Sequence, residues 1–351
     1  MTLSFYLPKW LKYSISIAFT TFITLSGIYA QQAKSSSEIN LYSSRHYDTD
    51  KRLYSDFENK TGIKIRRIED KADALINRIT AEGDNSPADI LITVDAGRLW
   101  AADQLGLFQP THSKLLNSVI PRNLRHPDGH WFGFSTRARV IFYDKKRIGD
   151  PPRSYLALAD TKYKGLVCTR SSSNIYMLSL MSNIIERLGE EAAKDWAAGV
   201  WNNRARYPEG GDTDQLRGIA SGQCGIAIAN TYYFARALRK KVRNLSGKTN
   251  NIGIIFPNQN STGTHINISG AGILTKSPNR ANAIKFLEYL ASKKAQTYFA
   301  AGNDEYPVLK GAAPNTNIVK LGAFKSDNLD LTIYGKNQAL AQRLYDEVGY
   351  R

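Results

Sequence analysis

The sequence predicts an α/β protein of two lobes joined by two extended crossings. Short apolar runs typical of strands alternate with amphipathic segments typical of helices. Two longer β-rich runs, at residues 132–144 and 265–275, are long enough to pass between lobes. About 320 residues follow an apolar N-terminal segment, and this length suits two lobes with a core each.

Residues 1–30 have the layout of a secretory signal peptide. Lys9 and Lys12 precede an uncharged apolar run from Tyr13 to Ala30, which ends in the small residue expected at a cleavage site. We expect cleavage near Ala30 and a mature protein in the periplasm. A retained transmembrane anchor is the alternative, although Ser and Thr make the run a poor span for about 20 residues of hydrocarbon.

The predicted elements follow one another in a regular order. Strands are expected at residues 39–43, 63–68 and 88–94, and helices at 50–60, 71–82, 96–104 and 278–300. The sheets should be largely parallel. We expect the N-terminal lobe to comprise residues 31–138 and 265–318, and the C-terminal lobe to comprise residues 139–264 and 319–351.

The charge of the chain is strongly positive. Its formal net charge is +16, and removal of residues 1–30, which carry two lysines and no acid, leaves +14. Such a charge attracts acidic surfaces such as membrane headgroups, nucleic acid or anionic chelates. The basic cluster at 239–241 lacks the interleaved aromatics of a nucleic-acid module, so no nucleic-acid partner is expected.

The chain has two cysteines, Cys168 and Cys224, in apolar stretches. In an exported protein an even pair favours a structural disulfide over a redox site, which usually has closely spaced cysteines. Two buried free thiols are the alternative.

Three tyrosine-bearing segments carry the strongest functional signal. They are His46-Tyr47, Tyr176 and Tyr232-Tyr233, and each lies at or just before the start of a predicted helix. Backbone N–H groups and the helix dipole favour negative charge there, which helps to ionise a phenol whose ordinary pKa is about 10. Converging phenolates are hard anionic ligands that suit Fe(III).

Four phenolates on Fe(III) leave one negative charge, which Arg45, Arg137 or Arg236 could balance without being ligands. His46 could add a neutral imidazole or a hydrogen bond to a ligand. The alternative interpretation of the tyrosines is half-buried packing, because the chain contains 19 of them.

Four motifs resemble those of the iron-binding periplasmic proteins of ABC importers, most closely the FutA-type branch of cyanobacteria. They are LYSSRHYD at 41–48, VDAGRLW at 94–100, STR at 135–137 and IANTYY at 228–233. The resemblance implies a type II periplasmic binding protein fold that closes on one iron ion in a cleft between lobes. It also implies delivery of that ion to an ABC permease of the inner membrane.

Carried over by position, the implied ligands are Tyr47 from the first lobe and Tyr176, Tyr232 and Tyr233 from the second. His46 matches a position that is a fifth ligand in some members only, so its role stays open. The resemblance implies no need for a synergistic anion such as carbonate or citrate. Members of this family are also suspected of encountering Fe(II), but phenolate ligands favour Fe(III). A monomer is expected.

Other classes of function have weaker support. The chain has no His-Glu-x-x-His zinc motif and no Gly-x-Ser-x-Gly elbow, and its five histidines are not expected to cluster, so we do not expect an enzyme. A periplasmic binding protein for an organic anion or metal chelate is a closer alternative. A protective partner of a membrane complex is another.

Overall fold

The computed structural model describes residue 1, residues 37–45 and residues 49–351. Residues 38–351 form a compact unit, and the fold below is that of this unit. The predicted signal peptide, His46 and Tyr47 lie outside the described residues. Within the described part of the chain, no helix is long and apolar enough to span a bilayer.

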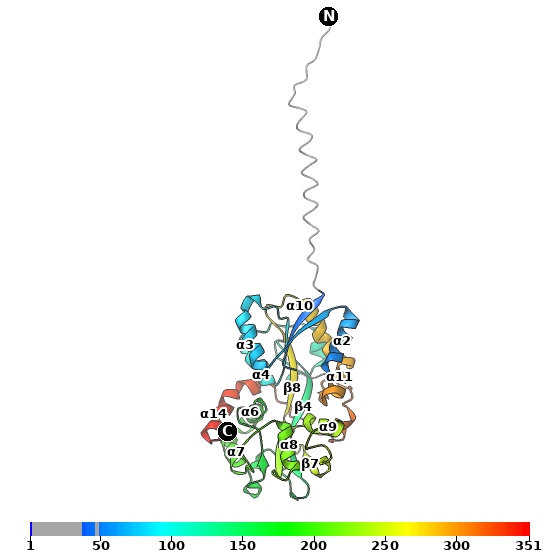
Figure 1. Ribbon diagram of the computed structural model, residues 1–351. Coiled ribbons are helices and arrows are strands. Elements are labelled where there is room, and N and C mark those ends of the chain that lie inside the picture. The colour runs from blue at the N-terminus through cyan, green and yellow to red at the C-terminus, as the bar shows by residue number, and fades with distance from the viewer. Residues whose placement is uncertain (2–36, 46–48) are drawn as a thin grey trace. The chain divides into compact units, whose positions relative to one another are not determined.

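Strands and helices alternate along the chain (Figure 1). The strands are β1 (Glu38–Ser43), β2 (Lys64–Glu69), β3 (Ile90–Val94), β4 (Phe132–Asp144), β5 (Val167–Cys168), β6 (Ile226–Asn230), β7 (Ile252–Ile255), β8 (Ile266–Ile273) and β9 (Tyr306–Pro307). The helices are α2 (Asp50–Thr61), α3 (Ala72–Glu82), α4 (Ala96–Gln104), α5 (Lys114–Val119), α6 (Ile175–Leu188), α7 (Glu190–Asn202), α8 (Asp212–Ala220), α9 (Thr231–Arg239), α10 (Arg280–Leu290), α11 (Lys293–Asn303), α12 (Thr316–Val319), α13 (Thr332–Lys336) and α14 (Gln338–Glu347).

The strands of the described residues form one continuous path, β2-β1-β3-β8-β4-β6-β5, with β7 and β9 also paired to β4. The two predicted crossings are β4 and β8, which run antiparallel to each other. β4 pairs with β8 over Phe132–Ala138 and with β6 over Arg139–Tyr143, so it changes partner in the middle. The exact lobe boundaries stay a prediction.

The predicted α/β class is confirmed, but the prediction of largely parallel sheets is wrong. Only β1 with β2, β1 with β3, and β5 with β6 are parallel among the described ladders. The ladders that involve β4 or β8 are antiparallel.

One predicted helix is two helices. The apolar spacing over residues 278–300 predicted a single helix, whereas α10 ends at Leu290 and α11 begins at Lys293. Ser292 causes the break because its side chain accepts the N–H of Ala295 and caps α11. Periodicity alone did not show this break, since both helices bury the same kind of residue against the first lobe.

Alternate residues of the crossing strand face two different cores. Val140 and Phe142 belong to the larger hydrophobic cluster, which also includes the core of the first lobe. Ile141 points to the second cluster, which α6, α7 and α14 complete with residues such as Trp196 and Leu344. Figure 1 shows these three helices on one side of the second lobe, with α8 and α9 on another.

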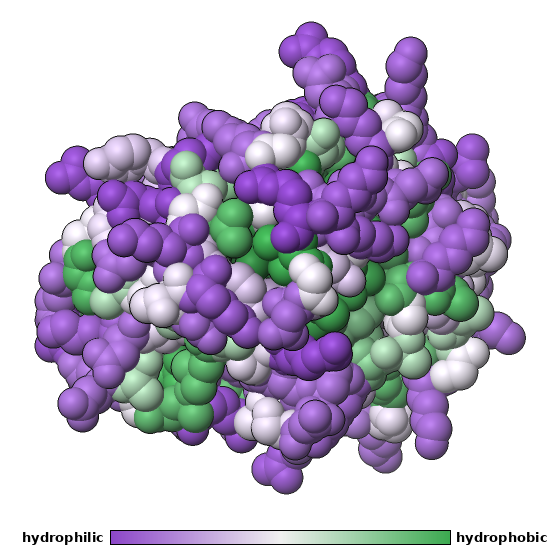
Figure 2. Space-filling view, turned by 90° about the horizontal axis from the view of Figure 1, so that it is seen from below, coloured by the Kyte–Doolittle hydropathy of each residue, from purple (hydrophilic) through white to green (hydrophobic). Residues whose placement is uncertain are grey.

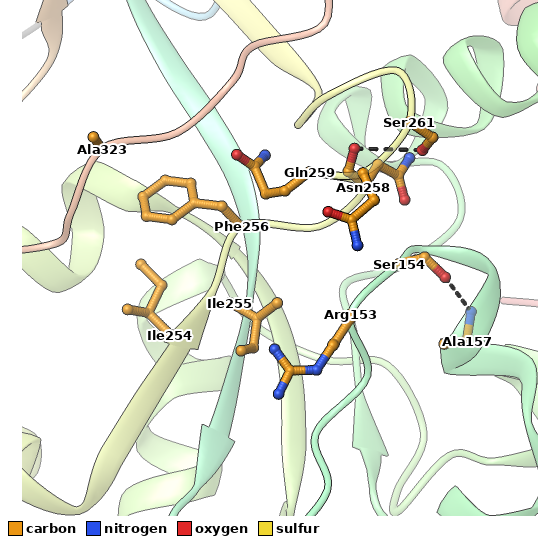
Figure 3. A pocket seen from close by; sticks show the side chains of 11 residues that line it. Arg153, Ser154, Ala157, Ile254, Ile255, Phe256, Asn258, Gln259, Ser261 and Ala323 are labelled. Atoms are coloured by element: carbon orange, nitrogen blue, oxygen red, sulfur yellow. Dashed lines mark hydrogen bonds between the residues drawn. The ribbon is translucent and has the colours of Figure 1, made fainter.

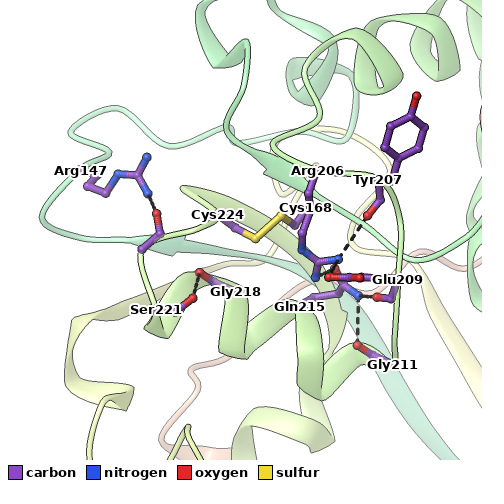
Figure 4. The surroundings of a disulfide bond; sticks show 11 residues. Arg147, Cys168, Arg206, Tyr207, Glu209, Gly211, Gln215, Gly218, Ser221 and Cys224 are labelled. Atoms are coloured by element: carbon purple, nitrogen blue, oxygen red, sulfur yellow. Dashed lines mark hydrogen bonds and ion pairs between the residues drawn. A yellow bond between two sulfur atoms is a disulfide. The ribbon is translucent and has the colours of Figure 1, made fainter.

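Cys168 and Cys224 form a disulfide, as predicted, and the alternative of free thiols is excluded (Figure 4). Their Cα atoms are 5.8 Å apart and both side chains are buried. The bond ties β5 to the turn that precedes β6, so it reinforces a strand of only two residues.

Replacement of both cysteines, Cys168→Ala with Cys224→Ala, should lower the free energy of unfolding by about 4 kcal/mol. The reason is that the disulfide restricts an unfolded loop with a sequence separation of 56 residues. Guanidinium denaturation with and without dithiothreitol measures this. The reductant should destabilise the wild type and leave the double variant unchanged; equal stability of the two oxidised proteins would contradict the prediction.

Candidate metal centre

Tyr176 lies in the first turn of α6. Asn174 is the N-cap of this helix, and its side-chain oxygen accepts the N–H of Tyr176 at 3.1 Å. This local bond fixes where the helix begins and therefore where the phenol points. The buried residues that follow, including Met177 and Leu180, hold α6 against the second core.

Tyr232 and Tyr233 lie in the first turn of α9, directly after the fully buried strand β6. Their ring centroids are 4.1 Å apart, and the hydroxyl of Tyr232 is 3.4 Å from that of Tyr176. Two helix N-termini of the second lobe therefore bring phenols to one place, as the sequence predicted. Their role as ligands stays a prediction.

These phenols line a cavity of about 500 Å³. Its other lining residues come from both lobes and are Ser44, Lys71, Ala72, Asp73, Val94, Arg98 and Arg236. The predicted ligands His46 and Tyr47 lie outside the described residues, but Ser44, two positions before His46, lines the cavity. The cavity is therefore a cleft between a tyrosine-rich wall and the first lobe.

Guanidinium groups surround Tyr176. Those of Arg137, Arg139 and Arg170 lie 5.4, 5.7 and 5.5 Å from its ring centroid. Arg236 lies 4.9 Å from the ring of Tyr233. These positive charges can offset the negative charge of a phenolate-rich ferric site.

Arg137 is the most deeply placed of these cations. It is buried, and its three nitrogen atoms have no hydrogen-bond partner among the described residues. Burial lowers the pKa of Arg137, but Coulombic attraction to Tyr176, Asp95, Tyr232 and Glu305 outweighs burial and raises the pKa. Its positive charge is therefore held beside the phenols.

The charge-balancing role of Arg45, Arg137 and Arg236 stays a prediction, but their positions can be described. Arg137 and Arg236 contact the tyrosine rings, as expected for that role. Arg45 has ion pairs with Asp50 and Glu305. The sequence analysis did not predict that Arg139 and Arg170 also lie beside Tyr176. For Arg139 a signal was present, because it follows Arg137 by two residues on one strand and therefore lies on the same face.

Arg45 belongs to a buried ionic network beside the segment that carries Tyr47. Its guanidinium lies 3.0 Å from the carboxylate of Asp50 and 3.1 Å from that of Glu305. Glu305 also accepts hydrogen bonds from Ser135 of β4 and Ser269 of β8, both at 3.0 Å. The network thus links the segment after β1 to both crossing strands.

The described residues on both sides of His46 and Tyr47 are also anchored. Ser44 donates to the Thr93 hydroxyl at 2.8 Å, and Thr49 is hydrogen-bonded to the side chain of Asn303. Gly302 permits the second contact, because a Cβ there would lie 2.5 Å from the Cβ of Thr49. The neighbours of the first-lobe ligand segment are therefore fixed by β3 and α11.

Asp95 connects the two lobes at the edge of this site. It has a positive φ of 84° and caps α4 by accepting the N–H of Gly97. Its carboxylate also accepts the hydroxyl of Ser179 on α6 at 2.7 Å and the amide of Asn267 on β8 at 2.9 Å. Arg137 is 3.7 Å away.

Another cavity, of about 450 Å³, lies on the second lobe between residues 153–157 and the segment after β7 (Figure 3). Its polar groups are amides, hydroxyls and the guanidinium of Arg153, with no tyrosine and no carboxylate. Figure 2 shows the end of the unit near β7 and α8, where hydrophilic side chains cover most of the face. The amides, hydroxyls and guanidinium that line this second cavity do not suit a ferric ion.

Comparisons with known proteins define the class. A family model described as bacterial extracellular solute-binding protein matches residues 85–325. The iron uptake protein A1 of Synechocystis sp. is 47% identical over 315 residues, which are 90% of this chain and 88% of that protein. The Fe(3+)-binding periplasmic protein of Serratia marcescens is 28% identical over 304 residues, which are 86% and 88% of the two chains. The chain belongs to the family of bacterial extracellular solute-binding proteins.

Solved structures place it more narrowly. Trichodesmium FutA (IdiA), described in complex with iron and citrate, matches with a TM-score of 0.87 and 50% identity, over 90% of this chain and 100% of that one. Apo FutA2 from Synechocystis matches with a TM-score of 0.85 and 48% identity at the same coverage. The predicted resemblance to the FutA-type branch and the two-lobed type II fold are confirmed.

Glu305→Gln should lower the free energy of unfolding by about 3 kcal/mol, because it leaves the buried Arg45 with an incomplete set of carboxylates. Urea denaturation measures the effect. Glu209→Gln is the matched control: Glu209 also pairs with an arginine, Arg206, but its side chain is 69% exposed, so about 0.5 kcal/mol or less is expected. Equal effects would contradict the importance of the network.

His265→Gln should flatten the dependence of stability on pH. His265 is buried, and burial and then the charges of Arg139 and Arg137 lower its pKa well below 6.5. Below about pH 6.5 the unfolded chain binds a proton that the folded chain does not, so wild-type stability falls as pH falls, by about 1.4 kcal/mol per unit for this group.

Denaturant titrations at pH 8, 7, 6 and 5 check this expectation. His112→Gln is the control, because His112 is exposed and should retain the wild-type slope. A variant at His265 that loses stability with acid as steeply as the wild type would contradict the assignment.

Proposed function

We propose that this protein captures ferric iron between its lobes and delivers it to an ABC permease of the inner membrane. The observation that carries the proposal is the convergence of Tyr176, Tyr232 and Tyr233 on one inter-lobe cavity beside guanidinium groups. Relatives named as iron uptake and Fe(3+)-binding periplasmic proteins support the choice of cargo.

The proposed ligands are Tyr47, Tyr176, Tyr232 and Tyr233, with His46 as a fifth ligand or as a hydrogen-bonding neighbour. Phenolates are hard anionic donors, so Fe(III) is held more tightly than Fe(II). Metal binding completes the deprotonation of the phenols, which the helix N-termini favour.

Closure of the lobes follows from the distribution of these ligands. We assign residues 31–138 and 265–318 to the first lobe and residues 139–264 and 319–351 to the second, a division supported by the change of partner within β4. Tyr47 then approaches from one lobe and the other tyrosines from the other. Only the closed form completes the coordination shell, so iron binding stabilises closure, which the permease can recognise.

The proposed setting is the periplasm, after cleavage of the signal peptide near Ala30, with the protein as a monomer. Relatives of this family are binding and transport proteins, which supports a role in binding and not in catalysis. The partners are iron and the permease, and no nucleic acid is involved.

Binding of an organic anion or metal chelate is the alternative function. The guanidinium groups of Arg137, Arg170 and Arg236 favour an anion, and the description of the Trichodesmium protein names citrate beside iron. In that case the tyrosines would form a hydrogen-bonding wall and iron alone would give no coloured complex.

An absorption titration of the mature, chelator-stripped protein with ferric iron tests the proposal. The wild type should form a one-to-one complex with a phenolate-to-iron charge-transfer band. Tyr47→Phe and Tyr233→Phe should each weaken or shift that band. Tyr207→Phe is the matched control, since Tyr207 is 65% exposed and does not line the cavity.

Two further results decide between the alternatives. No band, or a band unchanged by both cleft substitutions, would refute iron binding by these tyrosines. A band that requires citrate or carbonate would contradict the expectation that no synergistic anion is needed, while leaving the tyrosine site in place.

A further inference from the structure

A cluster of two imidazoles and a carboxylate lies outside the tyrosine cavity. The cluster consists of Asp103, His126 and His130, whose ligand atoms all lie within 4.8 Å of one another. In the described part of the chain it is the only such group of three or more His, Cys, Asp or Glu side chains. None of them lines the tyrosine cavity. We call them the His–Asp cluster. The expectation that the histidines do not cluster is therefore wrong for this pair.

The fold brings the two histidines together through a tight turn. The N–H of His126 donates to the carbonyl of Trp131 at 2.9 Å, and that of Gly129 donates to the carbonyl of His126 at 3.0 Å. The turn requires the positive φ of 74° at Gly129. As a result the imidazoles of His126 and His130 stack, with ring centroids 4.5 Å apart and planes within 3° of parallel.

Asp103, near the end of α4, lies against both imidazoles. One carboxylate oxygen is 2.5 Å from Nδ1 of His130, and the other is 3.3 Å from Nε2 of His126. The carboxylate is only 8% exposed, whereas the two imidazoles are 14% and 25% exposed. The two imidazoles are therefore partly accessible to solvent, whereas the carboxylate is largely buried.

We propose that the His–Asp cluster is a second metal site, for a borderline divalent cation such as Zn²⁺, with Nε2 of His126, Nδ1 of His130 and one oxygen of Asp103 as ligands. Two imidazoles and a carboxylate are a ligand set that such ions favour, and water can complete a four-coordinate shell. Ligand type separates this site from the phenolate cavity, which suits a harder ion.

Metal binding replaces protons that now join the three side chains. Nδ1 of His126 accepts the N–H of Asp128 at 3.1 Å, so the proton of a neutral ring is on Nε2, facing Asp103. A neutral imidazole keeps one ring proton, so an ion at Nε2 of His126 requires that proton to move to Nδ1, which then gives up the N–H of Asp128. In the same way, an ion at Nδ1 of His130 requires the ring proton of His130 to be on Nε2. The N···O separation of 2.5 Å must widen to admit an ion with bonds of about 2.0–2.2 Å.

The ion would join two parts of the first lobe. Asp103 is on α4, whose first turn follows Asp95, and the turn containing both histidines leads into β4. A bound ion would therefore stabilise the contact between α4 and the start of the crossing strand. Trp131 lies edge-on to His126, with ring centroids 5.9 Å apart, and gives a fluorescence signal close to the site.

Isothermal titration of tag-free mature protein with Zn²⁺ tests the proposal, with the protein both iron-free and iron-loaded. One equivalent should bind in both forms and raise the thermal unfolding temperature. His126→Ala with His130→Ala should weaken binding at least about tenfold. His112→Ala is the matched control and should bind as the wild type does, because His112 is exposed and outside the cluster.

Asp103→Asn provides an independent variant that keeps the side-chain shape and removes the charge. It should also weaken Zn²⁺ binding at least about tenfold, with circular dichroism unchanged. The iron titration of both cluster variants should match the wild type. No Zn²⁺ binding to the wild type, unchanged binding in both cluster variants, or loss of binding in Tyr233→Phe would overturn the proposal.

Discussion

The geometry of the cleft depends on the hydrogen bonds that the carboxylate of Asp95 accepts. This fully buried group caps α4 of the first lobe, accepts a hydrogen bond from Asn267 of β8, and accepts another from Ser179 of α6 in the second lobe. Tyr176 lies three residues before Ser179 on α6, and Arg98 lies three residues after Asp95. The Asp95 carboxylate thus joins the start of α4 to Ser179, about one turn after Tyr176 on α6, and both helices contribute residues to the same cavity. Its positive φ is a local strain maintained by these bonds.

Electrostatics and helix geometry act together at this site. The helix N-termini place the phenols, and Arg137, Arg139 and Arg170 supply positive charge around Tyr176. The lowered pKa of His265 has related causes, since burial and then the charges of Arg139 and Arg137 oppose protonation of its imidazole. The proposed phenolate site therefore lies in surroundings whose positive charge can compensate its own negative charge.

Local signals allowed most of the fold to be predicted from the sequence, and nonlocal contacts account for the rest. The beginning of α6 could be predicted because its cap, Asn174, bonds to a neighbouring residue. α9 begins after Asn230 without a side-chain cap. The break at Ser292 was missed, since hydrophobic spacing continues on both sides of it. Arg170 and the His–Asp cluster were missed because they depend on how distant segments pack, which periodicity does not encode.

The contact of Gly302 on α11 with Thr49 shows that the anchoring of a residue beside the proposed ligand segment can depend on a residue without a side chain. Gly302 is separated from Thr49 by some 250 positions, yet only a hydrogen atom fits between them. A methyl group at this position would push on the residue that closes the segment containing His46 and Tyr47. In a mutational screen, substitutions of this glycine would resemble substitutions of the proposed ligand Tyr47, although the side chain of Tyr47 would still be present.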